Sequence, residues 1–180
     1  MRLEPLSTGH AAGLLGLLDT DLWAWMTSPM PDGVEEMTSF IQATVERTAT
    51  LAFAVVDADT GEVRGSTSFY DLAPAQGRVE VGSTFYGRRF WGGPTNPACK
   101  MLLFGHAFEE LGLHRVALRC DARNARSAAA IRRLGAVPEG VLRGHRVAAD
   151  GSRGDTAYFS VLAPEWPQVQ GGLARRLSAA

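Results

Sequence analysis

The stretch GRVEVGSTFYGRRFWGGPTNPACKMLLFGHAFEELG, residues 77–112, decides the fold. Its first ten residues alternate as a strand does, and residues 97–112 repeat apolar side chains at helical spacing. Asn96 suits the cap of this helix, Pro97 its first position and Gly112 its end. A strand that runs through a glycine-rich loop into a helix start presents free backbone N–H groups and favours anion binding. An ordinary turn is an equally good interpretation of the loop by itself.

The segments on either side of this stretch predict one α+β domain over residues 1–166. We expect a mostly antiparallel sheet flanked by helices, with one parallel strand-helix-strand unit over residues 77–122. A glycine-rich, basic tail over residues 167–180 is expected to fray. Strand patterns cover residues 2–6, 50–72, 77–86, 114–122 and 136–162, and the other helical patterns cover residues 7–19, 34–49 and 124–135.

Composition limits the classes of function. The chain has 180 residues, 46% of them apolar, and a formal net charge of −1, which argues against a nucleic-acid partner. Its longest apolar run is too short to cross a membrane, and its N-terminus lacks the apolar core of a signal peptide. Two cysteines are too few for a disulfide framework or a zinc site, and the histidines show no metal-ligand spacing. We therefore expect a cytoplasmic protein without a metal.

Several motifs of the chain resemble a known family. The loop contains neither the Walker motif nor the dinucleotide-binding glycine pattern. The segments VEVGSTFY (residues 79–86), FWGGPTNPACK (residues 90–100) and NARSAAAIRRLGA (residues 124–136) are similar to those of the GNAT acyltransferase superfamily, in particular its RimJ/RimL-type branch. The resemblance extends over nearly the whole chain except the tail, and it implies that acetyl-CoA is the acyl donor.

The resemblance also implies a donor site. In this branch the pyrophosphate lies on backbone N–H groups of the loop, here residues 91–96, and the pantetheine arm pairs like a strand with residues 84–86. Arg89 and Lys100 are expected to be cations near the phosphates. The expected donor-binding residues are Thr84, Phe85, Tyr86, Arg89, Trp91, Gly92, Gly93, Thr95, Asn96, Lys100, Asn124 and Ser127.

Pro94 departs from the family pattern. The branch usually reads W-G-T-G-V-N in this loop, whereas this chain reads W-G-G-P-T-N, with Pro94 in the place of the second glycine. Proline has no N–H group and a fixed φ, so one phosphate contact is lost unless Gly93 compensates. Weaker binding of acetyl-CoA, or a different acyl donor, follows from this difference.

Glu80 and Ser127 are the candidate catalytic residues. Transfer to an amine needs a base, and the resemblance places Glu80 beside the acceptor pocket. The alternative for Glu80 is a half-exposed strand residue paired with Arg78 or Arg64. Ser127 is a candidate donor to the leaving sulfur. Tyrosine is the acid in many relatives.

Three further places bear on the acceptor pocket. The branch more often has its tyrosine at residue 159, where this chain has phenylalanine, so Tyr158 faces the other way and is not carried over. His145 either lines the acceptor pocket or lies at the surface. The segment containing Trp23, Trp25 and Met26 either folds over the acceptor or forms a small core.

The leading hypothesis is an acetyl-CoA-dependent N-acetyltransferase that acts on a primary amine, either a protein N-terminus or a small molecule. The alternative is a non-catalytic acyl-CoA-binding or regulatory protein, which Pro94 favours. A serine hydrolase is unsupported because the G-x-S-x-G motif is absent. Exposed sheet edges also make a homodimer an expectation.

Overall fold

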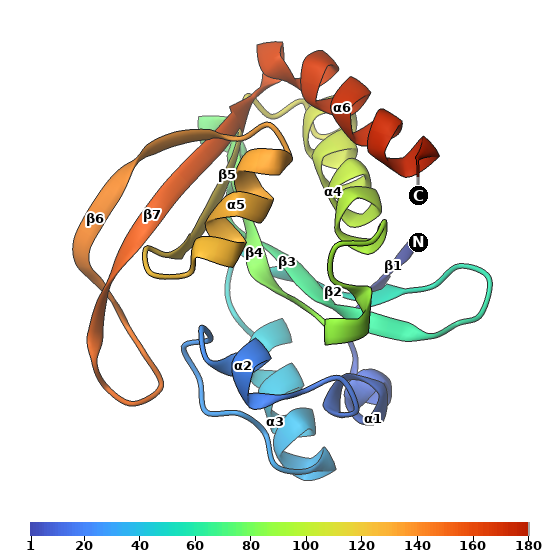
Figure 1. Cartoon of the computed structure of the whole chain (residues 1–180), viewed down its shortest axis with the longest axis vertical. Coiled ribbons are helices and arrows are strands. Elements are labelled where there is room, and N and C mark those ends of the chain that lie inside the picture. The colour runs from blue at the N-terminus through green and yellow to red at the C-terminus, as the bar shows by residue number, and fades with distance from the viewer. Residues whose placement is uncertain (180) are drawn as a thin grey trace.

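Seven strands form one sheet in the order β1-β2-β3-β4-β5-β7-β6 (Figure 1) in the computed structural model, which describes residues 1–179. All neighbouring strands are antiparallel except β4 and β5, which are parallel. The predicted α+β fold with a mostly antiparallel sheet is confirmed. The strands are β1 (Arg2–Pro5), β2 (Leu51–Val56), β3 (Val63–Ala73), β4 (Arg78–Tyr86), β5 (Arg115–Asp121), β6 (Val137–Val147) and β7 (Arg153–Leu162).

Helices cover both faces of the sheet (Figure 1). They are α1 (Ala11–Leu15), α2 (Thr20–Trp23), α3 (Val34–Val45), α4 (Thr95–Gly105), α5 (Ala125–Arg133) and α6 (Trp166–Ser178). Side chains alternate along β2, so Ala52 and Ala54 pack with α1–α3 while Val55 packs with the core beneath α4, α5 and α6. Within residues 1–179, no helix has the length and apolar character needed to cross a bilayer.

The C-terminal segment differs from its predicted state. We expected residues 167–180 to fray, but α6 continues to Ser178 and packs against α4. Trp166, Val169 and Leu173 are buried on one face of α6 at spacings of three and four residues. This apolar stripe supplies the packing energy that a glycine-rich composition alone does not suggest, so the tail prediction is wrong for residues 167–178.

The predicted first helix is divided in two. A 3₁₀ turn (Thr8–His10) and α1 occupy the first part of residues 7–19, and α2 follows as a separate helix. The Oδ1 atom of Asp19 accepts a hydrogen bond from the backbone N–H of Leu22 at 2.8 Å and thereby caps α2. The second predicted helix ends at Val45 instead of residue 49, where Ala49 turns the chain with a φ of 54°.

Helix α4 begins earlier than predicted. Pro94, not Asn96, occupies its cap position, because the φ of −73° at Pro94 is already helical. Pro97 lies in the first turn, where its missing N–H costs no helical hydrogen bond. The helix continues as a wider turn (His106–Glu110), and Gly112 ends it with a φ of 61°.

Strand β4 leaves β5 after a short contact. The two strands pair only from Arg78↔Arg115 to Glu80↔Ala117 among the described residues. The pairing of β4 with β3 is irregular just beyond this point, where Ser83 has a left-handed φ of 46°. The two parallel strands therefore diverge and leave backbone groups of β4 free of a strand partner on that side.

Candidate functional site

A cavity of about 770 Å³ lies where β4 and β5 diverge. Its walls come from the end of β4, the loop before α4, the start of α5, β6 and the segments that flank α3. The cavity brings together most of the residues expected to bind the acyl donor. These are Thr84, Phe85, Tyr86, Trp91, Gly92, Asn96, Lys100, Asn124 and Ser127.

Trp91 anchors the loop before α4. Its indole Nε1 donates a hydrogen bond to the backbone oxygen of Tyr86 at 2.8 Å. The guanidinium of Arg126, at the start of α5, lies 3.4 Å from the centre of the indole ring. Gly92 follows with a φ of 78° and open space around its Cα, so the backbone is accessible there.

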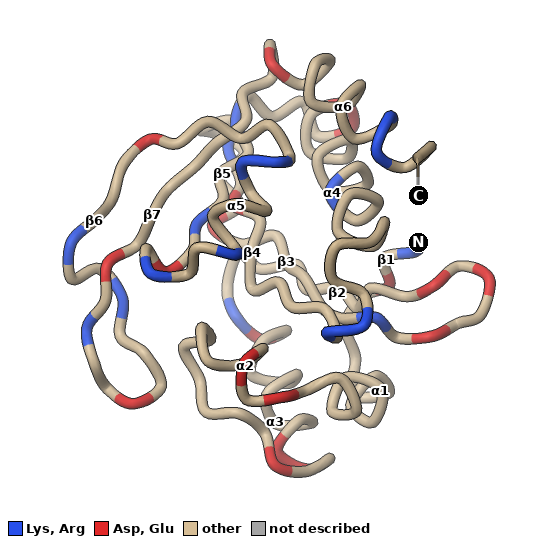
Figure 2. The backbone as a smooth tube through the Cα atoms, in the orientation of Figure 1, with Lys and Arg blue, Asp and Glu red and all other residues tan. Residues whose placement is uncertain are grey.

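Arg126 is a site residue that the sequence analysis missed. No carboxylate lies within ion-pair distance of its guanidinium among residues 1–179. Burial, and then repulsion from Arg88, lowers the pKa of Arg126. Figure 2 shows that the charged residues of α5 are all basic, whereas acidic residues gather at α2 and in the hairpin between β2 and β3. Arg126 borders the cavity, where its unpaired positive charge attracts an anion.

Asn124 caps α5. Its Oδ1 accepts a hydrogen bond from the backbone N–H of Ser127 at 2.9 Å. Ser127 borders the cavity. Burial raises the pKa of the Cys120 thiol, and the Ser127 side chain lowers it to a smaller extent. The structure therefore places a hydroxyl in the cavity wall at the beginning of α5.

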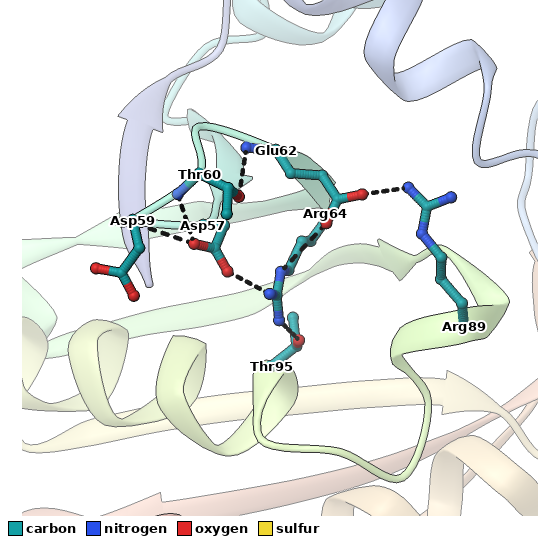
Figure 3. A network of polar contacts seen from close by, with 7 residues as sticks. All are labelled: Asp57, Asp59, Thr60, Glu62, Arg64, Arg89 and Thr95. Carbon is teal, nitrogen blue, oxygen red and sulfur yellow. Dashed lines mark hydrogen bonds and ion pairs between the residues drawn. The ribbon is translucent and has the colours of Figure 1, made fainter.

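Arg89, Gly93 and Thr95 do not border the cavity. Figure 3 shows Arg89 and Thr95 within a polar network that involves the β2–β3 hairpin. The Nη2 atom of Arg89 donates to Glu62 Oε1 at 2.6 Å, and Thr95 Oγ1 accepts from Arg64 Nη1 at 3.2 Å. The roles of these residues in donor binding stay predictions, and their observed contacts instead fasten the start of α4 to the hairpin.

Lys100 is the only lysine of the chain and lies in the cavity wall. Its side chain is 3% exposed, and its Nζ donates to Thr84 Oγ1 at 3.3 Å. Burial lowers the pKa of the ammonium group. A buried amine is protonated less readily than an exposed one, so the role of Lys100 as a cation near the phosphates stays a prediction.

Glu80 is buried behind the cavity and does not border it. Its Oε1 accepts a hydrogen bond from the Tyr70 hydroxyl at 2.5 Å and lies 2.9 Å from Arg119 Nε. Burial raises the pKa of Glu80, and the contacts with Tyr70 and Arg119 oppose this. The alternative of a half-exposed glutamate paired with Arg78 or Arg64 is wrong, because those arginines pair with aspartates.

Tyr158 and Phe159 point to opposite faces of β7, as the strand period requires. Phe159 is buried in the core, whereas the Tyr158 hydroxyl accepts a hydrogen bond from Arg119 Nη1 at 2.8 Å. His145 borders the cavity, and its Nδ1 lies 3.1 Å from Thr156 Oγ1. Within the described chain, no group of histidine, cysteine and acidic residues is arranged to hold a metal.

The segment with Trp23, Trp25 and Met26 was expected either to fold over the acceptor or to form a small core, and its residues divide between the cavity wall and a buried core. Trp25 and Met26 border the cavity. Trp23 is instead buried, with its ring edge-on to those of Phe40 and Phe85 at 5.3 and 5.2 Å between centroids. The segment therefore forms part of the cavity wall and is fixed by a small aromatic core.

The family follows from a match over most of the chain. Residues 1–137 match the profile of the acetyltransferase (GNAT) domain. The chain belongs to the GNAT acetyltransferase family. This GNAT chain is 34% identical over 107 residues to "Putative ribosomal N-acetyltransferase YdaF" of Bacillus subtilis (strain 168), a match that covers 59% of the chain and 57% of that protein.

Two crystal structures extend the similarity to nearly the full GNAT chain. One, described as a "putative acetyltransferase" from T. thermophilus, is 36% identical with a TM-score of 0.91, over 98% of this chain and 93% of its own. The other, a GCN5-related N-acetyltransferase from Brucella melitensis, is 30% identical with the same TM-score of 0.91, over 98% of this chain and 81% of its own. The likeness therefore includes β6, β7 and α6, which lie beyond the profile match.

Proposed function

We propose that the protein transfers the acetyl group of acetyl-CoA to a primary amine, either a protein N-terminus or a small-molecule amine. The observation that carries this proposal is the cavity at the divergence of β4 and β5, bordered by the loop before α4 and the start of α5. An extended pantetheine arm fits the free edge of β4 at residues 84–86. Membership of the GNAT family supports the same donor.

The residues that border the cavity suit an anionic donor, although the loop before α4 offers fewer backbone N–H groups than the family's usual loop. The open backbone at Gly92 and the unpaired guanidinium of Arg126 both favour phosphate. Pro94 and Pro97 contribute no N–H group, and the N–H of Ala98 is already bonded to the Pro94 oxygen at 2.9 Å. We infer that Arg126 supplies part of the phosphate binding that backbone N–H groups provide in the family's usual loop.

The chemistry requires a neutral amine and a protonated leaving group. Glu80 is proposed as the base that receives the proton of the amine, since its raised pKa suits proton transfer. The hydroxyl of Ser127 is proposed to donate a hydrogen bond to the departing sulfur. The cavity walls supply the orientation of the two substrates, which can account for much of the rate.

The name of the B. subtilis relative suggests a ribosomal protein as acceptor, and we include peptide N-termini for that reason. Acetyl-CoA is incubated with the protein and a panel of N-terminal peptides, polyamines and aminoglycosides, and CoA thiol release and product mass are measured. A product heavier by one acetyl group supports the proposal. Thiol release without such a product, or none at all, contradicts it.

A non-catalytic acyl-CoA-binding protein is the second candidate, favoured by the two prolines at the start of α4. It predicts binding of acetyl-CoA without turnover on any amine. The same panel, accompanied by a binding titration, separates the two candidates.

A further inference from the structure

Tyr70 stands between the cavity and Glu80. Glu80 is 5% exposed and lies outside the cavity lining, whereas Tyr70 borders the cavity. The two residues are directly opposite in the pairing of β3 with β4, so their side chains share one face of the sheet. The hydroxyl of Tyr70 donates to Glu80 Oε1 at 2.5 Å. A substrate in the cavity therefore meets the phenol before the carboxylate.

The position of the Tyr70 ring is set by its neighbours. A Cβ atom at Gly82 would lie 2.7 Å from both Cε1 and the hydroxyl oxygen of Tyr70, so the ring occupies space that only glycine leaves free. The guanidinium of Arg119 lies 5.0 Å from the centre of the same ring and 2.9 Å, through Nε, from Glu80 Oε1. These contacts hold the hydroxyl against the carboxylate.

We propose that Tyr70 is a catalytic residue that relays the proton of the acceptor amine to Glu80, an inference that rests on the acetyl transfer proposed above. As the amine nitrogen bonds to the thioester carbon, one N–H bond breaks and its proton moves to the Tyr70 oxygen. The proton already on Tyr70 moves to Glu80 Oε1. The C–S bond breaks with its electron pair on sulfur, the thiolate takes a proton from water, and Glu80 returns its proton to water.

The surroundings of Glu80 are compatible with this relay. Burial raises the pKa of the Tyr70 phenol, which therefore stays neutral and acts only as a carrier. Burial also raises the pKa of Glu80, so this carboxylate accepts a proton more readily than an exposed glutamate does. The charged and titratable groups that face Glu80 are Tyr70 and Asp71 from β3, Arg115 and Arg119 from β5, and His145 from β6.

The relay is tested with Tyr70→Phe, Glu80→Gln and the double variant, assayed with the best amine of the panel. Each single change is expected to lower kcat about 100-fold, and the double variant should be no slower, because both act on one proton path. KM for acetyl-CoA should stay within about threefold. In the wild type, kcat should rise with pH as Glu80 loses its proton and becomes able to accept one. This rise should disappear in all three variants. His145 is kept throughout, so any contribution of its ring remains in every profile.

Tyr158→Phe is the matched control. It removes a hydroxyl that also contacts Arg119, but from a ring outside the cavity lining. Its kcat should stay within about threefold of the wild type, as for a change away from the reacting groups. Circular dichroism and thermal unfolding confirm that each variant is folded.

A solvent-isotope measurement on the wild type tests the relay without depending on whether any variant folds. Two protons move in the relay, so kcat in mixtures of H₂O and D₂O should follow a curved dependence on deuterium content. A linear dependence, or a Tyr70→Phe variant with normal kcat and pH profile beside an impaired Glu80→Gln variant, overturns the relay and leaves the proposed function standing. A wild type that acetylates no amine overturns both.

Discussion

The guanidinium of Arg126 packs over the Trp91 indole, 3.4 Å from the centre of the ring. Both residues border the cavity, and their contact joins the loop before α4 to the first turn of α5. Arg88 lies 5.2 Å from the same ring but is held by Asp19 and Asp21. Only Arg126 of these two arginines is therefore available to a bound anion.

Arg126→Ala should weaken the binding of acetyl-CoA about tenfold, because a charge-assisted contact with phosphate is worth about 1.5–3 kcal/mol. Its kcat with saturating donor should change little, since Arg126 is not among the groups that contact Glu80. Calorimetric titration measures the affinity. Arg133→Ala, an exposed arginine of the same helix, is the control and should bind normally. Equal affinities in the two variants would contradict a role for Arg126.

Gly82→Ala should lower kcat at least about tenfold, because small displacements of a positioned group reduce rates strongly. The added methyl group would displace the Tyr70 ring that lies against Gly82. Gly33→Ala, where the added carbon meets no atom within 4 Å, is the control. Steady-state kinetics measures kcat for both variants. A Gly82→Ala enzyme as fast as the control would show that kcat does not depend on the position of the Tyr70 ring.

Lys100→Met should reveal a pH dependence of stability. The pKa of Lys100 is lowered in the folded protein, while that of an unfolded lysine is about 10.4. The folded state therefore binds fewer protons, and the wild type gains stability relative to the variant as pH rises towards the unfolded pKa. Urea unfolding at neutral and alkaline pH measures this difference. A difference that does not change, or that falls with rising pH, would show that burial does not affect the amine.

Leu173→Ala should reduce the free energy of unfolding by about 2–5 kcal/mol, as expected for a buried leucine. Leu173 is 1% exposed on the inner face of α6. Leu102→Ala, at a position 44% exposed on α4, should cost much less and serves as the control. Urea denaturation compares the two. Similar small losses would mean that α6 does not belong to the cooperative core.

The sequence predicted the strands well because their signals are local. Alternation along residues 77–86, for example, depends only on neighbours in the chain. Helix α6 was missed because Gly171 and Gly172 hide the spacing of its three buried side chains. The cap at Asn96 was assigned wrongly because Pro94 was taken as part of a loop, although its fixed φ suits a helix start.

Most of the residues expected to bind the donor border the cavity, whereas Glu80, expected beside the acceptor pocket, does not. These residues come from the continuous stretch between residues 84 and 100 and from the start of α5. Tyr70 and Arg119 reach Glu80 from the neighbouring strands β3 and β5, and Arg126 reaches Trp91 from another helix. Such contacts depend on strand register and on packing between distant segments, which one sequence does not reveal.

Titration of the wild-type protein with acetyl-CoA by calorimetry tests the central claim most directly, because both the proposed transfer and the proton relay require the cavity to hold this donor. A Pro94→Gly variant is titrated beside it, since glycine restores an N–H group at the start of α4. We expect saturable one-site binding by the wild type that weakens with added salt, and tighter binding by the variant. Absence of binding in both proteins would contradict the assignment of the cavity.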